Sequence, residues 1–437
     1  MKIKKWVAAT VMGASLLSTN ALAQTEIQWW HSMDGALTEW VNDLAKGFNE
    51  SQSDYKVVPV YKGGYEQSMT AGVAAFRAGE APDILQVYEV GTASMIYAKG
   101  VTKSVTEIMR DNNIHFDLND YIPAVASYYT APNGELLSLP FNSSTTVMYY
   151  NKDAFKKAGL DADHPPKTWA EVRSAAEQLK AAGYSCPMTT EWMGWTQLES
   201  FSAWHNEPYA SKNNGFDGLD VELLINKPLQ LRHFNNLADM AKEGLFVYKG
   251  RASEAGPAFR SGECAMTFGS SASYGGLKRD AQFEFGETTL PYYEDVAGAP
   301  QNTVIGGASL WVMSGKPDDH YKGVAKFFEY ISQPDVQAAS HMRTGYLPVT
   351  KAAFEITEKS GFYEQNPGAE VPVEQMIRKA TNNTRGIRLG NMLQIRAIVD
   401  EETEQIWTGK KTAEQALSTI VERGNELLRR FERVNNR

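Results

Sequence analysis

The 437-residue sequence lacks the local motifs that usually carry chemistry. Its seven histidines are scattered, and neither H-E-x-x-H nor a zinc-type pairing of Cys and His occurs. A P-loop, a G-x-G-x-x-G turn, a G-x-S-x-G elbow and an EF-hand loop are absent as well. We therefore predict no catalytic residue, no cofactor and no metal site. A glycosidase stays open, because its two carboxylates need no fixed spacing.

The chain also has fewer basic than acidic residues. The chain has 43 Lys and Arg against 52 Asp and Glu, a net charge of −9 at pH 7. Nucleic acid and anionic membrane surfaces are therefore poor partners. A small anionic ligand remains open, because a binding site needs only a few local donors.

Long apolar runs are confined to the start of the chain. The basic residues 1–5 precede an apolar stretch over 6–17 and the triplet Ala-Leu-Ala at 21–23. This order is typical of a secretory signal peptide, and the stretch is shorter than the ~20 residues that span a bilayer. We expect cleavage after residue 23 rather than an uncleaved anchor, and a soluble mature chain outside the cytoplasm.

Only two cysteines occur, Cys186 and Cys264. A disulfide can persist in an oxidising compartment. Both residues lie beside predicted strands of one lobe, so a bridge and a pair of buried free thiols both remain open.

A short pattern, Phe-Arg-x-Gly-Glu, occurs twice, at 76–80 and 259–263. Each copy ends a predicted helix, and glycine adopts the left-handed conformation after a helix end at low cost. Apolar strands follow at 84–88 and 265–268. Two such helix-to-strand returns, far apart in the chain, indicate two α/β lobes.

Alternating periodicities support this fold class. Predicted strands cover 26–30, 55–61, 84–88, 137–140 and 147–151, and a glycine turn enters a further strand within 306–313. Predicted helices cover 37–49, 65–78, 169–182, 228–243, 321–332, 394–407 and 413–431. The helix at 169 begins with a capping box, Thr168 with Glu171. The alternation over 26–88 predicts a parallel arrangement with right-handed crossovers.

Polar groups gather where predicted strands end, which is where open α/β sheets bind ligands. Ser143-Ser144, Ser270-Ser271 and Gly306-Gly307 offer hydroxyl and backbone N–H donors that suit phosphate or carboxylate oxygens. Glu89 follows a buried-looking strand, where an unpaired carboxylate is costly. It suits a vicinal diol as an acceptor, although a cap or an ion pair explains it equally well.

Aromatic and basic side chains complete the candidate site. Trp192, Trp195 and Trp204 surround a glycine-containing loop, which suits stacking on a sugar or polyol, although core packing is the usual reason. Arg396 lies on a helix with apolar neighbours. Its guanidinium can clamp a phosphate or pair with Asp400 four residues later.

Several sequence blocks resemble a known family. Residues 76–83 and 345–349 are similar to segments of the extracellular solute-binding proteins of ABC importers, in the maltose-binding group. Four further blocks resemble the periplasmic binding proteins for sn-glycerol 3-phosphate within that family: residues 30–33, 61–67, 85–92 and 388–392. The resemblance covers essentially the whole mature chain.

The resemblance implies a set of ligand-binding residues. Nine positions have the residue type of the family pattern: Tyr65, Glu89, Ser144, Trp192, Trp195, Ser270, Gly307, Tyr346 and Arg396. Glu89 would hold glycerol hydroxyls, and the Ser, Tyr, glycine N–H and Arg donors would hold phosphate. Tyr65 and Tyr346 enter the set through the resemblance alone.

The family also implies an architecture and partners. We expect a two-lobed type II periplasmic binding protein, each lobe an open, mainly parallel sheet flanked by helices, with hinge crossings between the lobes near 139–146, 269–275 and 344–348. The N-terminal lobe would comprise 24–140 with 273–344, and the C-terminal lobe 141–272 with 345–437. The implied cargo is sn-glycerol 3-phosphate or a diester such as glycerophosphocholine.

The implied partner is an ABC permease of two membrane subunits with an ATPase, served by a monomeric periplasmic protein that is not an enzyme. Two alternatives remain. One is an oligosaccharide-binding protein of the same fold, and the other is a secreted hydrolase of glycosides or phosphodiesters.

Overall fold

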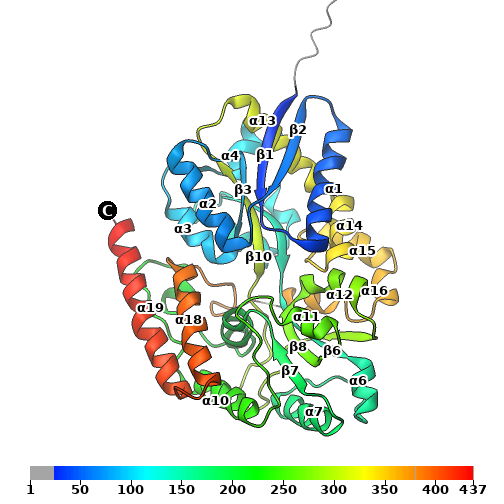
Figure 1. Cartoon of the computed structure of the whole chain (residues 1–437). Helices are drawn as coiled ribbons and strands as arrows, with labels where there is room; N and C mark the ends of the chain where they lie inside the picture. Colours follow the sequence, from blue (N-terminus) through cyan, green and yellow to red (C-terminus); the bar gives the residue numbers. More distant parts are fainter. Residues whose placement is uncertain (1–23, 379, 437) are drawn as a thin grey trace, which may run out of the picture.

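Two α/β lobes make up the described chain. The structure, a computed structural model, describes residues 24–378 and 380–436, so the predicted signal peptide at 1–23 lies outside the described residues. The lobes are stacked one above the other in Figure 1, each around its own sheet. These two sheets confirm the predicted two-lobed α/β fold.

In the described part of the chain, no helix is both long enough and apolar enough to span a bilayer.

The first lobe contains a six-stranded sheet in the order β2-β1-β3-β10-β4, with β5 paired to β10. Its strands are β1 (Thr25–His31), β2 (Tyr55–Tyr61), β3 (Ile84–Tyr88), β4 (Thr102–Lys103), β5 (Leu139–Ser144) and β10 (Gly306–Met313). The helical segments in its part of the chain are α1 (Gly35–Ser51), α2 (Tyr65–Ala78), η1 (Glu89–Gly91), α3 (Thr92–Tyr97), α4 (Val105–Asp111), η2 (Leu118–Asp120), α5 (Pro123–Tyr129), α13 (Asp318–Ile331), α14 (Pro334–Thr344), α15 (Lys351–Lys359) and α16 (Phe362–Gln365).

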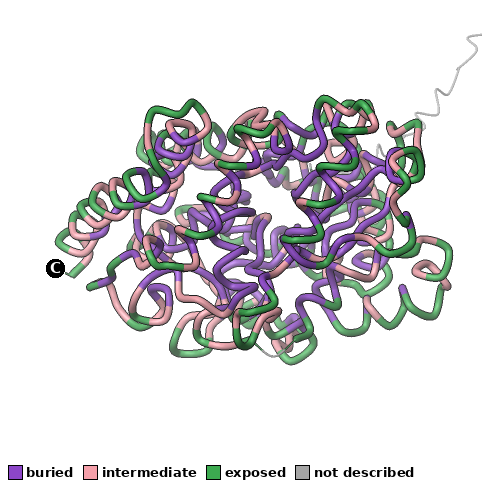
Figure 2. Tube along the Cα trace, turned by 90° about the horizontal axis from the view of Figure 1, so that it is seen from below, coloured by how far each residue is buried: buried purple, intermediate pink, exposed green. Residues whose placement is uncertain are grey.

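The second lobe contains a four-stranded sheet in the order β7-β8-β6-β9. Its strands are β6 (Thr146–Asn151), β7 (Cys186–Thr190), β8 (Cys264–Ser270) and β9 (Phe285–Thr288). The remaining helical segments are α6 (Lys152–Lys157), α7 (Trp169–Ala181), the π-helical η3 (Gly194–Ser200), α8 (Phe201–Trp204), the left-handed turn α9 (Ser211–Gly215), α10 (Pro228–Lys242), α11 (Gly256–Arg260), η4 (Ser271–Ser273), α12 (Tyr274–Asp280), α17 (Val371–Met376), α18 (Met392–Trp407) and α19 (Ala413–Asn435). Buried positions lie in the interior of the molecule and exposed positions lie toward its outside (Figure 2).

Local signals place many of these elements where the sequence predicts them. Gly79 ends α2 in the left-handed conformation with φ 75°, and Gly262 follows α11 with φ 80°. Both glycines lead into buried strands, as the repeated pattern predicts. The capping box of Thr168 and Glu171 also forms at the start of α7.

The strand directions agree with mainly parallel sheets, each with one reversed strand. β10 runs antiparallel to β3, β4 and β5, and β6 runs antiparallel to β8 and β9, while the other strands of each sheet share one direction. Both reversed strands begin at the boundary between the lobes, since β6 follows β5 after a single residue and Gly306 pairs with Ser144. They therefore run away from a boundary that β1, β3, β5, β7 and β8 approach. The carboxyl ends of five strands and the amino ends of two meet there.

Strand pairing also differs from the predicted lobe ranges. Residues 141–144 continue β5 rather than forming the expected loop, because they pair with the start of β10. The range 273–344 was assigned to the first lobe, but β9 within it pairs with the free edge of β6. Conversely, Leu347 and Val349 pack in the core of the first lobe. Which residues move together as rigid bodies remains a prediction.

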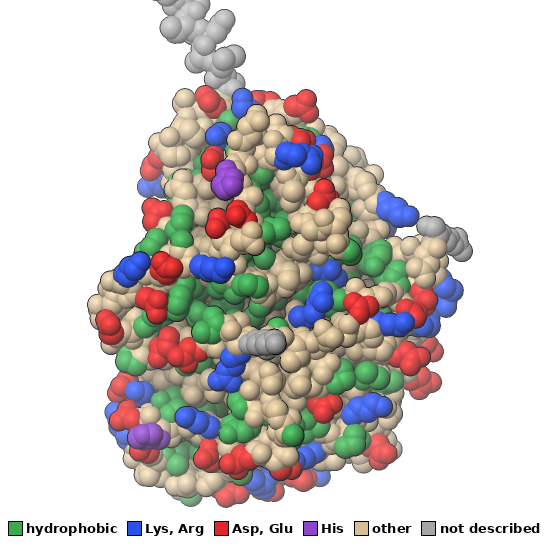
Figure 3. All heavy atoms as spheres, turned by 180° about the vertical axis from the view of Figure 1, so that it is seen from behind, with side chains coloured by type: hydrophobic (Ala, Val, Ile, Leu, Met, Phe, Trp, Pro, Cys, Tyr) green, Lys and Arg blue, Asp and Glu red, His purple; other side chains and the backbone are tan. Residues whose placement is uncertain are grey.

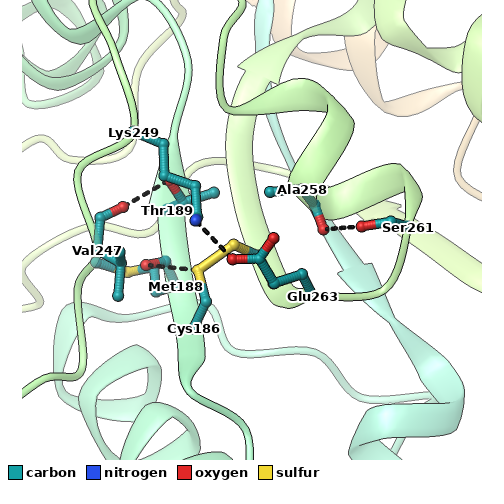
Figure 4. Close-up of a disulfide and its surroundings, with 9 residues drawn as sticks. Cys186, Met188, Thr189, Val247, Lys249, Ala258, Ser261 and Glu263 are labelled. Atoms are coloured by element: carbon teal, nitrogen blue, oxygen red, sulfur yellow. Dashed lines mark hydrogen bonds and ion pairs between the residues drawn. A yellow bond between two sulfur atoms is a disulfide. The ribbon is translucent and has the colours of Figure 1, made fainter.

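A disulfide joins neighbouring strands of the second sheet. Cys186 and Cys264 are register partners on β7 and β8, and their sulfur atoms lie 2.08 Å apart (Figure 4). The bridge closes a separation of 78 residues. Of the two states that the sequence left open, the structure therefore contains the disulfide.

Charged side chains of both signs are mixed on the face of the molecule shown in Figure 3. This distribution agrees with the moderate net charge of −9.

Candidate functional site

A cavity of ≈ 710 Å³ lies where the strand ends of the two lobes meet. This volume is typical of small-molecule sites, which range from about 300 to 1,000 Å³. All nine residues predicted for the site line this one cavity: Tyr65, Glu89, Ser144, Trp192, Trp195, Ser270, Gly307, Tyr346 and Arg396. Trp204, which the sequence placed with the other tryptophans, is instead buried in the core of the second lobe.

Two glycines shape the cavity wall at the start of β10. Gly307 has φ +84°, and a Cβ atom there would lie 1.8 Å from the Asn142 carbonyl oxygen. At Gly306, a Cβ atom would lie 2.3 Å from the Trp195 ring. Glycine is therefore required at 307 for the β5–β10 approach, and at 306 for the close packing of Trp195.

Hydroxyl groups are available near these glycines. The Ser270 Oγ accepts a hydrogen bond from the Ala272 N–H at 3.1 Å, so its own proton is free to donate into the cavity. Ser144, the register partner of Gly306, lines the same wall. Both serine hydroxyls can therefore donate hydrogen bonds to a ligand in the cavity.

Arg396 lies between two carboxylates rather than standing free. Its Nη2 lies 2.7 Å from Glu89 Oε1 in an ion pair, and its Nε and Nη2 each donate a hydrogen bond to one oxygen of Glu199 at 2.8 Å. The bidentate geometry fixes the plane of the guanidinium. Asp400, the partner that helical spacing suggests, makes no hydrogen bond with Arg396, so the acid partners are Glu89 and Glu199.

These contacts change the charges of the cluster. Burial raises the pKa of Glu89, while Arg396 opposes that rise. Although burial lowers the pKa of Arg396, Glu199 and Glu89 together hold it well above its usual value. The guanidinium therefore stays charged, and its charge opposes the effect of burial on the pKa of Glu89.

The cluster also connects the two lobes. Glu89 directly follows β3 of the first sheet, whereas Glu199 lies on η3 and Arg396 on α18. Nearby, the Tyr128 hydroxyl lies 2.7 Å from the Ile387 carbonyl oxygen, another contact between the lobes. α18 and α19 run along the side of the molecule in Figure 1, and Phe431 of α19 contacts Tyr97 of α3.

The tryptophan pair is held in an unusual local conformation. Trp192 has φ 50°, which is rare for a large side chain, and backbone hydrogen bonds to Ala252 and from Thr196 secure it. Trp195 lies on η3, four residues before Glu199, and its Nε1 is buried without a hydrogen-bond partner in the described structure. π-Helical segments occur often at functional sites. The two tryptophans thus form an aromatic part of the cavity wall.

Tyr65 is held by neighbours on two sides. Its ring stacks on Tyr88, with centroids 4.8 Å apart and planes 4° apart. Its hydroxyl accepts a hydrogen bond from Asn142 Nδ2 at 2.9 Å. Burial raises the pKa of Tyr65 well above its usual value, with Tyr346 adding to the effect, so the phenol remains protonated.

Sequence reasoning missed several cavity residues. Glu191 directly follows β7 just as Glu89 follows β3, and this shared position could have identified it. Burial raises the pKa of Glu191 to about 8, although Arg260 opposes the rise. Glu199, which holds Arg396 but does not line the cavity, carries a weaker signal, a charged residue inside the wholly buried segment η3. In residues 24–378 and 380–436, no cluster of three or more His, Cys, Asp or Glu is placed to hold a metal ion.

The fold and the cavity define a class of protein, the two-lobed binding proteins that enclose a small molecule between α/β lobes. A family described as bacterial extracellular solute-binding protein matches residues 43–371. This match covers well over half of the sequence. The chain belongs to this family of solute-binding proteins.

Two relatives match nearly the whole length of the chain. The sn-glycerol-3-phosphate-binding periplasmic protein UgpB of Yersinia enterocolitica is 56% identical over 420 residues, which cover 96% of this chain and 95% of that protein. UgpB of Salmonella typhimurium is 54% identical over 431 residues, 98% of each chain. The resemblance read from short sequence blocks is therefore confirmed along nearly the full length.

Solved structures show the same fold. UgpB from Mycobacterium tuberculosis in complex with glycerophosphocholine superposes with a TM-score of 0.79 at 22% identity, covering 93% of this chain and 99% of that chain. Maltose-bound MalE3 of T. maritima superposes with a TM-score of 0.72 at 18% identity, covering 91% and 98%. At these identities the likeness shows the architecture alone.

Proposed function

We propose that this chain is the periplasmic binding component of an ABC importer and that its cavity captures sn-glycerol 3-phosphate and diesters such as glycerophosphocholine. One observation carries the proposal: a single interlobe cavity holds a buried guanidinium, two free serine hydroxyls, two tyrosines and a tryptophan pair. The 54–56% identical relatives named for sn-glycerol 3-phosphate support the same cargo.

The ion-pair geometry indicates how phosphate would enter. Glu199 holds Arg396 through two nitrogens, whereas Glu89 holds only Nη2. A phosphate oxygen at the guanidinium would therefore compete with Glu89 and leave Glu199 in place. Glu89, released from Arg396, is then the acceptor for the glycerol hydroxyls, and Ser144, Ser270, Tyr65 and Tyr346 donate to phosphate.

We further propose that ligand contacts made from both lobes favour a closed form, which docks on a permease of two membrane subunits with an ATPase. Contacts that exist only in the closed form shift the population toward it. The crossings near Thr145 and Ser271 would act as hinges, joined by the hydrogen bond from the Ser271 N–H to the Thr145 oxygen at 2.9 Å. In this proposal the protein is a monomer, its leader is cleaved and it performs no chemistry.

Isothermal titration tests the cargo. The mature protein is unfolded and refolded to remove carried-over ligand, then titrated with sn-glycerol 3-phosphate, glycerophosphocholine and maltose. We expect micromolar-range binding of the phosphates and no heat with maltose. Heat with maltose alone would keep the fold and overturn the phosphate assignment. Choline released from glycerophosphocholine on long incubation would overturn the absence of catalysis.

A further inference from the structure

A buried chain of hydrogen bonds runs from a backbone amide to the Tyr65 hydroxyl. The Ser32 N–H donates to Gln86 Oε1 at 2.8 Å, and Gln86 Nε2 donates to Asn142 Oδ1 at 2.9 Å. Asn142 Nδ2 then donates to the Tyr65 hydroxyl at 2.9 Å. Gln86 and Asn142 are 1% and 0% exposed, so water does not compete for these groups.

The order of donors and acceptors along this chain is set at its first member. A backbone N–H can only donate, so the Ser32 amide requires the Gln86 oxygen to face it. The Gln86 amide must then present its NH₂ group to Asn142, which in turn presents its own NH₂ group to Tyr65. One backbone amide therefore determines the orientation of two side-chain amides from different strands.

This order of donors and acceptors decides how the hydroxyl of Tyr65, a residue of the cavity wall, can bind a ligand. Because the Tyr65 oxygen accepts from Asn142, the Tyr65 proton is not needed for that contact. The Tyr346 hydroxyl, which also lines the cavity and whose interaction raises the pKa of Tyr65, is the acceptor that a ligand oxygen would have to replace.

We call the chain from the Ser32 amide through Gln86 and Asn142 to Tyr65 the relay. The stacking of Tyr65 on Tyr88 holds the ring in place, and the relay makes the Tyr65 oxygen an acceptor toward Asn142. A phenol whose oxygen already accepts a hydrogen bond is a stronger donor.

We propose that Gln86 and Asn142 are positioning residues that make Tyr65 a hydrogen-bond donor toward a ligand oxyanion, and so contribute to the selection of phosphate esters. This inference rests on the proposed function, because it assigns a direction to one contact of the same site. Neither Gln86 nor Asn142 lines the cavity. Both act through Tyr65, two and one hydrogen bonds away from its hydroxyl.

The substitution Gln86→Glu tests the direction of the relay. A protonated glutamate reproduces glutamine, since its carbonyl accepts from Ser32 and its O–H donates to Asn142. An ionised glutamate has no donor, so the Asn142 amide must turn its NH₂ group toward residue 86 and its oxygen toward Tyr65. Tyr65 would then donate to Asn142 and lose the proton it offers to the ligand.

Glycerophosphocholine is the appropriate probe, because a phosphodiester does not titrate between pH 5 and pH 9. We expect the affinity of the Q86E variant to approach that of the wild-type protein at low pH and to fall about tenfold relative to it at high pH, the scale of one hydrogen bond to a charged group. Tyr65→Phe should cost affinity in the wild-type protein and nothing further in Q86E at high pH.

Parallel pH profiles of Q86E and wild type would overturn the relay, and so would an equal loss from Tyr65→Phe in both backgrounds. Failure of the wild-type protein to bind glycerophosphocholine would instead count against the proposed function. Gln86→Met, which cannot titrate, separates the relay from a general packing effect. It should weaken binding by the same factor at every pH while its thermal unfolding remains cooperative.

Discussion

Glu89 and Arg396 form an ion pair of 2.7 Å between the two lobes, and Glu199 holds the same guanidinium from the other side. The arginine is thus charged, oriented and already partnered before any ligand arrives. An anionic ligand must bind Arg396 more favourably than Glu89 does. A phosphate suits this requirement, because its oxygens accept hydrogen bonds from several donors of the cavity at once. The arrangement makes Arg396 the first position to test.

Substitution Arg396→Ala should weaken the binding of a phosphate ligand by more than about tenfold, the scale of a lost charge-assisted contact. It also leaves Glu89 and Glu199 buried without their cation, so the melting temperature should fall. Calorimetry and thermal unfolding measure the two effects. Arg385→Ala is the matched control, because Arg385 lines a different cavity and stacks on Phe216. Unchanged affinity in R396A would remove this residue from the site.

Gly307→Ala should destabilise the protein by about 2 kcal/mol or more, because it combines a left-handed backbone with overpacking. The added Cβ would lie 1.8 Å from the Asn142 oxygen, so β5 and β10 must move apart and the cavity wall must distort. Urea unfolding and ligand titration report the change. Gly276→Ala provides the control: Gly276 also lines the cavity, yet its Cβ meets nothing within 4 Å. Equal stability of both variants would contradict the argument.

The raised pKa of Glu191 makes stability depend on pH. The folded pKa is about 8, against 4.5 for the ordinary side chain, so between these values the folded state binds more protons than the unfolded one. Stability therefore falls as pH rises from about 4.5 to about 8, with a contribution on the order of a few kcal/mol from this group.

Glu191→Gln should remove that contribution and reduce the slope of the stability profile between pH 5 and pH 8, to which Asp400, with a pKa raised by burial to about 7, also contributes. Denaturant unfolding of both proteins at several pH values measures the difference. The gain of the variant should be largest near pH 8 and smallest near pH 5. A constant difference at all pH values would show that Glu191 does not titrate in this range.

Reduction of the Cys186–Cys264 disulfide should lower the free energy of unfolding by roughly 2–4 kcal/mol, because the bridge constrains a long loop in the unfolded chain. The closed separation is 78 residues. Ligand affinity should stay unchanged, since the cysteines lie at the starts of β7 and β8 and the cavity residues lie at or after their ends. Thermal unfolding with and without reductant, together with titration of the reduced protein, checks both parts.

Some elements were predictable because their signals are local. The helix at 65–78 and the strand at 84–88 match α2 and β3 residue for residue, since periodicity and terminal glycines act over a few neighbours. β5 extends further than predicted because residues 141–144 pair with a strand more than 160 positions later. Their own composition, rich in Asn and Ser, does not indicate a strand.

The candidate site divides in the same way. Strand-end serines, the glycine pair and Glu89 were visible in the sequence, because their positions follow from the ends of predicted elements. Glu199 was not visible as the partner of Arg396, since 197 residues separate them and only the packing of η3 against α18 joins them. Gln86 was hidden because its role depends on an amide in another segment.

The sequence by itself determined the two-lobed α/β architecture, the family resemblance and a set of residues that all reach one cavity. These features rest on hydrophobic periodicity, end signals and short blocks, which each part of the chain carries alone. Only the tertiary structure decided the reversed strand of each sheet, the disulfide, the ion-pair partners of Arg396 and the polarity of the relay to Tyr65. Those features depend on which distant groups become neighbours, and burial then decides which donors and acceptors must be satisfied together.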